Sequence, residues 1–303
     1  MNSNIGCVVV TYNRLNKLKN ALSKYDMQTL MPKYVLVVNN ASTDGTKEYL
    51  EKWKEIPSLY KKIVVSLNSN TGGSGGFYEG QKLALKESAD WIMLNDDDAY
   101  IDSNYLEVIQ DFIINNKTDD VSVICGRVMQ NHSYVNGHRR FLANKFRSSW
   151  YIDVPCEYYN EENFDFDLVS YVGPVINKNK LKSAGLVEKN YFIWFDDTEH
   201  SIRLRKEGKF ICINKIGVFH DIDEERNGLN WRNYYGYRNQ MDLIKKHFGI
   251  RKYFVISLFI VKALLCPLKG KSFTEAKLRL TAIKDGILGN LGKNDKYKPG
   301  WKP

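Results

Sequence analysis

Four short apolar runs, each followed directly by a polar loop, constrain the fold of this chain most strongly. They occupy Ile5 to Val10, Tyr34 to Val38, Ile63 to Leu67 and Trp91 to Leu94. Continuous apolar runs of this length are typical of strands buried on both faces of a parallel sheet. Between them, apolar residues every three or four positions predict helices over Leu15 to Tyr25, Thr46 to Lys54 and Gly76 to Ser88. The alternation predicts right-handed βαβ units and an α/β fold, with an open, mostly parallel twisted sheet flanked by helices.

The loops after these runs indicate where a ligand would bind, because ligands of open parallel sheets collect at the carboxyl ends of the strands. The loops read TYNR, NNASTDGT, NSNTGGSGG and NDDDA. In the third loop the glycines allow a ligand to approach the backbone closely, and the helix that follows offers free N–H groups: Gly72, Gly73, Gly75 and Gly76. A purely structural loop is the alternative.

Three consecutive carboxylates, Asp96, Asp97 and Asp98, follow the fourth apolar run. Their mutual repulsion at the end of a core strand would be costly without a cation. In an extended segment alternate side chains point to the same side, so Asp96 and Asp98 share a target. Mg²⁺ or Mn²⁺ bridging a diphosphate fits, since these ions take oxygen ligands from a few carboxylates and from phosphate. The alternative is a solvated acidic turn that caps a helix starting near Ser103.

Taken in order, the motifs VVVTYNR, VVNNASTDGT, NSNTGGSGGF and NDDDA resemble family 2 of the inverting glycosyltransferases over roughly the first three quarters of the chain. The triple Asp together with NxGGSGGF is most similar to the galactofuranosyltransferase and rhamnosyltransferase branch. The resemblance implies a GT-A type fold with a smaller C-terminal helical region. It also implies transfer of galactofuranose from UDP-galactofuranose to a lipid-linked or polysaccharide glycan. Rhamnose transfer from dTDP-rhamnose and a non-catalytic carbohydrate-binding protein are the alternatives.

The resemblance further implies a set of donor-binding residues in the loops at the strand ends: Thr11, Tyr12, Arg14, Asn40, Asn70, Gly72, Gly73, Asp96 and Asp97. It implies that Asp96 and Asp98 hold a divalent metal ion, Mn²⁺ or Mg²⁺. Members of the family often carry Asp in the second loop, where this chain has Asn39 and Asn40. The identity of the nucleotide therefore stays open.

A second acidic cluster, Asp196, Asp197 and Glu199, follows the strand-like aromatic run YFIWF and opens an amphipathic helix. Carboxylates suit a helix N-terminus, so simple capping is the alternative. The resemblance implies that Asp197 is the general base and that Asp196 and Glu199 orient the acceptor or support the base. Inverting transfer needs a base for the proton of the attacking hydroxyl. One carboxylate suffices if a metal carries the charge of the leaving group.

His220 ends the apolar run Ile211 to Phe219, and the resemblance implies that it completes the metal site with Asp98 and diphosphate oxygens. A surface histidine at a strand end is the alternative. The segment from Tyr171 to Gly185 occupies the place where the family shapes its donor-sugar and acceptor pocket. Its sequence departs from the family's usual versions, which leaves the sugar open.

The chain is expected to divide near Arg226 into a glycosyltransferase domain, residues 1–225, and a mostly helical region, residues 226–303. The segment WRNYYGYRNQ resembles the YYxxRN segment of the same branch, whose aromatic and Arg side chains either grip sugar and phosphate or dock a helix. An apolar stretch of about sixteen residues then follows Arg251 and Lys252, too short for a bilayer span of about twenty. Its basic ends fit a helix lying on an anionic membrane, and a buried helix of a homo-oligomer explains its apolar part equally well.

The formal charge of +9 argues for an anionic partner. A nucleic-acid binder would not explain two acidic clusters, so no nucleic-acid partner is expected. Five scattered cysteines without metal-finger spacing fit a reducing compartment, and the first residues lack the pattern of a signal peptide. The sequence therefore predicts a cytoplasmic enzyme that is peripheral at the inner face of the cell membrane.

Overall fold

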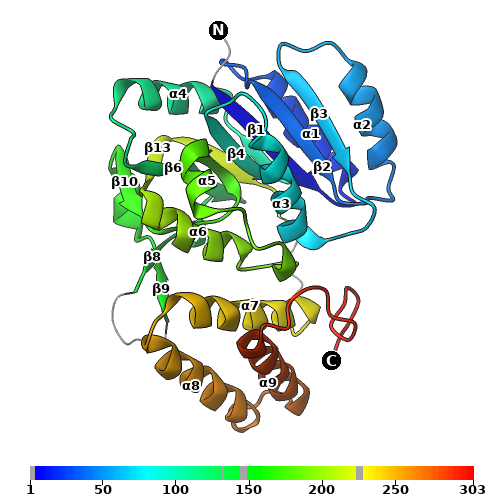
Figure 1. The fold of residues 1–303 in the computed structure, drawn as a ribbon, viewed down its shortest axis with the longest axis vertical. Helices are drawn as coiled ribbons and strands as arrows, with labels where there is room; N and C mark the ends of the chain where they lie inside the picture. Colours follow the sequence, from blue (N-terminus) through cyan, green and yellow to red (C-terminus); the bar gives the residue numbers. More distant parts are fainter. Residues whose placement is uncertain (1–3, 132, 144–148, 223–227) are drawn as a thin grey trace.

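The computed structural model describes residues 4–131, 133–143, 149–222 and 228–303. Figure 1 shows a large twisted sheet with helices on both faces, and the helices α7, α8 and α9 gathered at one end of this layered body. The predicted α/β class is confirmed, and so is a helical region near the C-terminus.

The first part of the chain follows the predicted alternation of strands and helices. Its elements are β1 (Ile5–Thr11), α1 (Leu15–Asp26), β2 (Tyr34–Asn39), α2 (Thr46–Glu55), β3 (Lys61–Ser66), α3 (Gly72–Ala84) and β4 (Trp91–Asp96). The strands β3, β2, β1 and β4 lie side by side and parallel, with Val8 of β1 between Leu36 and Leu94. Every residue of β1 and β2 is buried, which explains why their sequences are apolar throughout.

The rest of the sheet is built from strands farther along the chain. They are β5 (Ala99–Ile101), β6 (Val121–Gln130), β7 (Ser133–Tyr134), β10 (Asn163–Phe166), β12 (Val172–Asn177) and β13 (Lys209–His220). The main order is β10-β13-β6-β12-β4-β1-β2-β3. The strand β12 is antiparallel to both neighbours, β4 and β6, whereas β13 runs parallel to β6. The sheet is therefore mixed but mostly parallel.

Smaller elements complete this part. A second, three-stranded antiparallel sheet contains β8 (Arg139–Leu142), β9 (Tyr151–Asp153) and β11 (Leu168–Val169). The remaining helices are α4 (Tyr105–Asn115), α5 (Lys178–Ala184), α6 (Asp196–Glu207) and the short 3₁₀ turns η1 (Asn136–His138), η2 (Cys156–Asn160) and η3 (Lys189–Tyr191).

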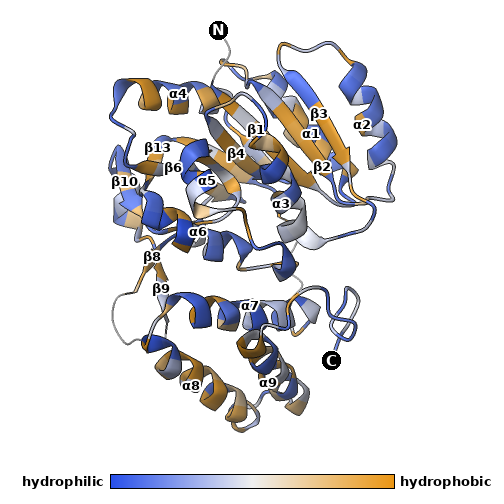
Figure 2. Cartoon of the chain, in the orientation of Figure 1, coloured by the Kyte–Doolittle hydropathy of each residue, from blue (hydrophilic) through white to orange (hydrophobic). Residues whose placement is uncertain are grey.

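Two hydrophobic clusters lie on opposite faces of the large sheet. One joins alternate residues of β1, such as Cys7 and Val9, to α1, α2 and α4. The other joins the intervening residues Val8 and Val10 to α3, α5 and α6. In Figure 2 the central strands are accordingly orange, while the solvent-facing α2 is largely blue. This two-sided burial fixes the register of the strands, because a one-residue slip would exchange the faces.

The helix α3 begins at Gly72, four residues earlier than predicted, so the glycine run is the first turn of the helix and not a loop. A Cβ atom on Gly76 would lie 2.5 Å from Cγ1 of Val10, and one on Gly80 would lie 2.4 Å from Cγ1 of Val8. Glycine at these positions therefore lets α3 lie directly on β1.

The C-terminal region consists of α7 (Trp231–His247), α8 (Arg251–Leu264), η4 (Pro267–Lys269) and α9 (Phe273–Leu288). It shares a hydrophobic cluster with the first part, in which Trp150 and Ile202 pack with Met241 and Ile283. The predicted boundary at Arg226 lies outside the described residues. Among the helices of the described ranges, none is long and apolar enough to cross a bilayer.

Candidate functional site

The triple Asp lies where β4 ends and the chain turns into β5, and its central member contacts the first loop. The carboxylate of Asp97 accepts a hydrogen bond of 2.7 Å from the hydroxyl of Thr11 and one of 3.4 Å from the backbone N–H of Tyr12. The guanidinium of Arg14 pairs with both Asp97 and Asp98. The structure thus brings together Thr11, Tyr12, Arg14 and the acidic cluster, and their contact with a donor stays a prediction.

Asp96, Asp98 and His220 form a group that could hold a metal ion. One ligand atom from each lies within 4.8 Å of the others. The pairing of β5 with β13 produces this arrangement, because Ala99, next to Asp98, lies opposite His220. Two carboxylates and an imidazole suit Mn²⁺ or Mg²⁺ when phosphate oxygens complete the shell.

The electrostatics of the cluster favour a bound cation. Burial, and then the charges of Asp98 and Asp97, raise the pKa of Asp96 well above its usual range. Burial also raises the pKa of Asp97 to about 6, although Arg14 opposes it. Burial alone would raise the pKa of Asp98, but His220 and Arg14 hold it below its ordinary value. Within the described chain, Oδ1 of Asp98 is buried without a hydrogen bond, and it faces His220. A buried carboxylate oxygen without a hydrogen bond is a suitable metal ligand.

His220 is held by a chain of side chains that the sequence analysis did not single out. Its Nδ1 atom lies 3.0 Å from Nε2 of Gln130, which lies 2.9 Å from Nε2 of His138. Nδ1 of His138 in turn lies 2.7 Å from the hydroxyl of Ser170. Such partners orient a metal-binding imidazole. No spacing in the sequence indicates this chain, because sheet pairing brings its members together.

The two predicted amide contacts, Asn40 and Asn70, lie together under the start of α3. The side chain of Asn40 is buried, accepts a hydrogen bond of 2.9 Å from the N–H of Thr71 and donates one of 2.8 Å to the carbonyl of Gly72. Oδ1 of Asn70 accepts one of 2.8 Å from the N–H of Gly72. Both amides therefore shape the turn into α3, and their contact with a nucleotide stays a prediction.

Close packing accounts for most of the glycines at the start of α3. A Cβ atom on Gly72, whose φ is +75°, would lie 1.9 Å from the carbonyl oxygen of Phe192. A Cβ atom on Gly75 would lie 2.3 Å from Oγ1 of Thr71. Gly73 differs, because within the described chain no atom beyond its chain neighbours and the backbone of its own helix lies within 4 Å of its Cβ position. Of the two glycines predicted to bind the donor, only Gly73 has this open space.

The second acidic cluster opens α6, as predicted, but the aromatic run before it is not a strand. Phe192, Trp194 and Phe195 have φ values of 67°, 67° and 66°, so the chain makes a tight turn. Trp194 is 43% exposed, whereas Phe192 and Asp196 on either side of it are buried. The prediction of a strand was wrong because contacts from α7 override the strand preference of aromatic residues.

Asp196 and Asp197 have different environments. Asp196 is buried, and burial followed by the charge of Asp197 raises its pKa to about 7. Asp197 is half-buried and accepts a hydrogen bond of 2.9 Å from the hydroxyl of Thr198. The charge of Asp196 also contributes to the raised pKa of Asp96. The two acidic clusters are thus close enough to act on each other.

Glu199 lies in an ion-pair network. It accepts hydrogen bonds of 2.8 Å from Nη2 of Arg203 and of 2.8 Å from Nε2 of His247. Burial raises its pKa, but His247 and Arg203 more than offset this and lower it to about 2. His247 was not singled out from the sequence. The structure therefore shows Glu199 tying α6 to the end of α7, and its role toward an acceptor stays a prediction.

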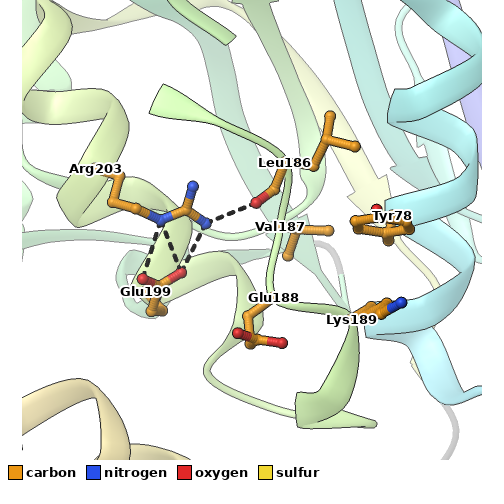
Figure 3. A pocket seen from close by; sticks show the side chains of 7 residues that line it. All are labelled: Tyr78, Leu186, Val187, Glu188, Lys189, Glu199 and Arg203. Atoms are coloured by element: carbon orange, nitrogen blue, oxygen red, sulfur yellow. Dashed lines mark hydrogen bonds and ion pairs between the residues drawn. The ribbon is translucent and has the colours of Figure 1, made fainter. Parts of the chain in front are cut away.

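Glu199 also lines a cavity of about 430 Å³. In Figure 3 the pair Glu199 and Arg203 lies on one side of this cavity, and Tyr78 of α3 lies with Lys189 on the other. A neighbouring cavity of about 520 Å³ shares Tyr78 and Lys189 and extends to the loop between β3 and α3. Aromatic, amide and charged side chains line this pair of cavities, which is the kind of surface that binds sugars.

Comparison with known proteins yields one family. Residues 7–169 of this chain match the protein family described as Glycosyl transferase family 2. The dTDP-rhamnosyl transferase RfbF of Shigella flexneri is 24% identical over 310 residues, which cover 96% of this chain and 98% of that protein. The galactofuranosyltransferase GlfT1 of Mycobacterium tuberculosis is 34% identical over 101 residues, which cover 33% of this chain and 32% of that protein.

Solved structures resemble the whole chain. S. aureus TarS, residues 1–349 in complex with UDP, superimposes with a TM-score of 0.61 at 16% identity, covering 95% of this chain and 80% of that one. GalNAc-T7 with UDP, GalNAc and Mn²⁺ superimposes with a TM-score of 0.65 at 14% identity, covering 94% of this chain and 56% of that one. At these identities the likeness is one of fold, and it confirms the GT-A type.

Proposed function

Because the chain belongs to glycosyl transferase family 2, we propose that this glycosyltransferase is inverting and metal-dependent and moves a sugar from a UDP-sugar to a glycan acceptor. One observation carries the proposal. The charge of Asp196 contributes to the raised pKa of Asp96, which belongs to the group Asp96, Asp98 and His220. A site with metal ligands on one side and a carboxylate pair on the other has the parts that the reaction needs.

Each part has a role in transfer. Asp96, Asp98 and His220 would hold a divalent ion, and such an ion would supply positive charge to the leaving diphosphate. Arg14 adds a cation beside Asp97 and Asp98. Asp197 takes the proton from the acceptor hydroxyl as its oxygen attacks the anomeric carbon opposite the diphosphate. Burial raises the pKa of Asp196 to about 7, so this carboxyl is itself protonated below neutral pH.

We propose UDP-galactofuranose as the donor and a lipid-linked or polysaccharide glycan as the acceptor. The galactofuranosyltransferase GlfT1 supports this donor through the higher identity of its matched segment. A dTDP-rhamnose donor is the second candidate, because the relative that matches along the whole chain is named a dTDP-rhamnosyl transferase. UDP in the TarS and GalNAc-T7 structures, and Mn²⁺ in the latter, support a UDP-sugar and a divalent metal.

A panel of UDP-, dTDP- and GDP-sugars with Mn²⁺ tests the donor. We expect UDP-galactofuranose to raise the melting temperature most, and EDTA to abolish the effect. A rise in melting temperature with dTDP-rhamnose alone would identify dTDP-rhamnose as the donor. Release of nucleoside diphosphate only when a glycan acceptor is present would separate a transferase from a carbohydrate-binding protein. Full turnover in metal-free buffer would contradict the metal assignment.

The C-terminal region supports a place at a membrane surface. Between Asp242 and Glu275 the chain has no carboxylate, while Lys262, Lys269 and Lys271 are exposed there. The same segment exposes large apolar side chains, namely Ile250, Tyr253, Phe254, Val261, Leu264, Leu265, Leu268 and Phe273. Figure 2 shows α8 largely in orange. We name this segment, residues 250–273, the basic apolar surface.

We propose that an anionic lipid surface covers the basic apolar surface. Leu268 is 83% and Phe273 is 82% exposed, close to the exposed Lys269 and Lys271. Apolar side chains flanked by lysines enter the headgroup region, where the lysines meet anionic lipid. A protein interface fits less well, because lysine is depleted from such interfaces.

Flotation with vesicles tests the membrane proposal. We expect binding to vesicles of phosphatidylcholine with anionic phosphatidylglycerol, weaker binding in high salt, and none to phosphatidylcholine alone. The double variant Leu268→Glu/Phe273→Glu removes exposed side chains only, so it is expected to fold and to lose binding. A wild-type dimer in solution that this variant converts to a monomer, with no vesicle binding, would assign the surface to a second copy instead.

A further inference from the structure

The segment from Phe192 to Phe195 has an unusual backbone. Of the six non-glycine residues with positive φ in the described ranges, three lie within these four positions. Phe192 has φ 67° and ψ −60°, and the N–H of Ile193 donates a hydrogen bond of 2.8 Å to the carbonyl of Tyr191. This is a γ-turn of the strained, positive-φ kind. Such strain persists only where the surroundings hold it, and it gathers at active sites.

One side chain from α7 holds the turn. Asn239 is fully buried, and its Nδ2 atom donates to the carbonyls of Tyr191, Ile193 and Trp194 at 2.9, 3.0 and 2.8 Å. Its Oδ1 atom accepts a hydrogen bond of 2.9 Å from Nε of Arg238. The amide is thereby fixed in one orientation, with its donors directed at the turn.

Arg238 belongs to the same arrangement. It is buried, and its guanidinium also donates a hydrogen bond of 3.0 Å to the carbonyl of Tyr191. Further hydrogen bonds reach the carbonyls of Asn190 and Gly292. Of the two interpretations of the RN pair, the docking of α7 is therefore the one that this geometry supports.

Two glycines leave no room for the turn to move. A Cβ atom on Gly72 of α3 would lie 1.9 Å from the carbonyl oxygen of Phe192. A Cβ atom on Gly236 of α7 would lie 2.9 Å from the ring of Trp194. The turn is enclosed between α3, which follows the third predicted donor loop, and α7, the first helix of the C-terminal region. The residue that follows the turn is Asp196, the first of α6.

We propose that Asn239 is a positioning residue for transfer, which holds the turn so that Asp196 and Asp197 face the metal cluster. It acts through the backbone and touches no substrate. This inference rests on the proposed role of Asp197 as base. It gives α7, a helix of the C-terminal region, a part in positioning the catalytic carboxylates.

The test separates the hydrogen bonds from packing. Asn239→Asp keeps the size of the side chain and replaces the donating NH₂ by an acceptor that faces three carbonyls. We expect both Asn239→Asp and Asn239→Ala to lower kcat by about 10²-fold, as for a misplaced catalytic group. The dissociation constant for UDP with Mn²⁺ is expected to stay within twofold, because the donor loops are intact. Gln240→Ala, the next residue of α7, is the matched control and is expected to retain kcat.

The effect of a loss of stability alone is measured with Leu50→Ala. This variant opens a cavity in the hydrophobic cluster of α1 and α2, and none of the described members of that cluster belongs to the turn. If Leu50→Ala lowers kcat as much as Asn239→Asp at an equal fall in melting temperature, the positioning role is refuted. Unchanged kcat in Asn239→Asp also refutes it. Normal turnover of Asp197→Asn would instead contradict the base assignment, which is a different failure.

Discussion

The Nε2 atom of His220 lies 3.4 Å from Oδ1 of Asp98, although the two residues are far apart in the chain. The antiparallel pairing of β5 with β13 sets this distance, since it places Ala99 opposite His220. The position of the imidazole is thus a property of the sheet.

We expect His220→Ala to weaken Mn²⁺ binding in the presence of UDP by at least about 10-fold, because loss of even an orienting partner has an effect of that size. Isothermal titration measures it. Gln130→Ala, which removes only the orienting contact, is expected to give a smaller loss. The control is His247→Ala, whose histidine contacts Glu199 and no member of the metal group. Equal Mn²⁺ affinity in His220→Ala and wild type would exclude His220 as a ligand.

Asp197→Asn is expected to lower kcat by about 10²- to 10⁴-fold, because the amide cannot take the proton of the acceptor hydroxyl. Donor binding should persist, since the residues of the first loop and the metal group are unchanged. A steady-state transfer assay and a UDP titration measure the two properties separately. Glu207→Gln, at the other end of α6, serves as the control and should behave as wild type. Near-normal turnover in Asp197→Asn would rule out this residue as the base.

Gly73→Ala and Gly76→Ala are expected to have opposite effects. The methyl group at position 73 enters open space, and alanine favours a helix, so the melting temperature should stay level or rise. The affinity for UDP should fall if the diphosphate approaches this backbone. At position 76 the methyl group would meet Val10, so unfolding should become easier by about 1–3 kcal/mol. Thermal denaturation and a UDP titration measure the two properties. Wild-type UDP affinity in Gly73→Ala would show that the donor does not approach here.

Asp196→Asn is expected to stabilise the metal-free protein above neutral pH. The pKa of Asp196 is raised from 3.8 to about 7, so between these values the folded state binds the proton more tightly than the unfolded state. Its contribution to stability is therefore present at low pH and is lost as pH rises toward 7. Because the variant does not lose stability in this way, its melting temperature at pH 8 should be about 2 °C or more above that of wild type. A change of 1 kcal/mol in the free energy of unfolding corresponds to about 2–4 °C in melting temperature.

Thermal scans from pH 5 to pH 8 in EDTA test this expectation. Asp111→Asn, an exposed carboxylate of α4, is the control and should keep the wild-type pH dependence. A pH dependence of Asp196→Asn that is as steep as that of wild type would contradict the raised pKa of Asp196.

The sequence predicts β1, β2 and β4 well because both of their faces are buried, which leaves a continuous apolar signal. It predicts β12 and the mixed character of the sheet poorly. The strand β12 is antiparallel between β4 and β6, and such pairing depends on contacts between distant segments. The start of α3 was placed too late, since glycine weakens a helical pattern even where close packing requires it.

The residues of the candidate site likewise divide into those that the sequence predicts and those that it does not. Asp96 and Asp98 could be found because adjacent carboxylates at a strand end form a local signal. Gln130 and His138 could not, since only the sheet brings them to His220. The strained turn before Asp196 was missed for a related reason. Its aromatic residues favour a strand, and the contacts from Asn239 that decide otherwise come from another helix.

The contact of α7 with the turn has a consequence for protein engineering. In a chimera that joins the first part of this chain to the helices of a relative, the relative's helix would take the place of α7, which carries Gly236 and Asn239. Exchange of donor specificity by recombination therefore needs a crossover point after α7. A junction before α7 would combine a turn from one parent with a support from the other.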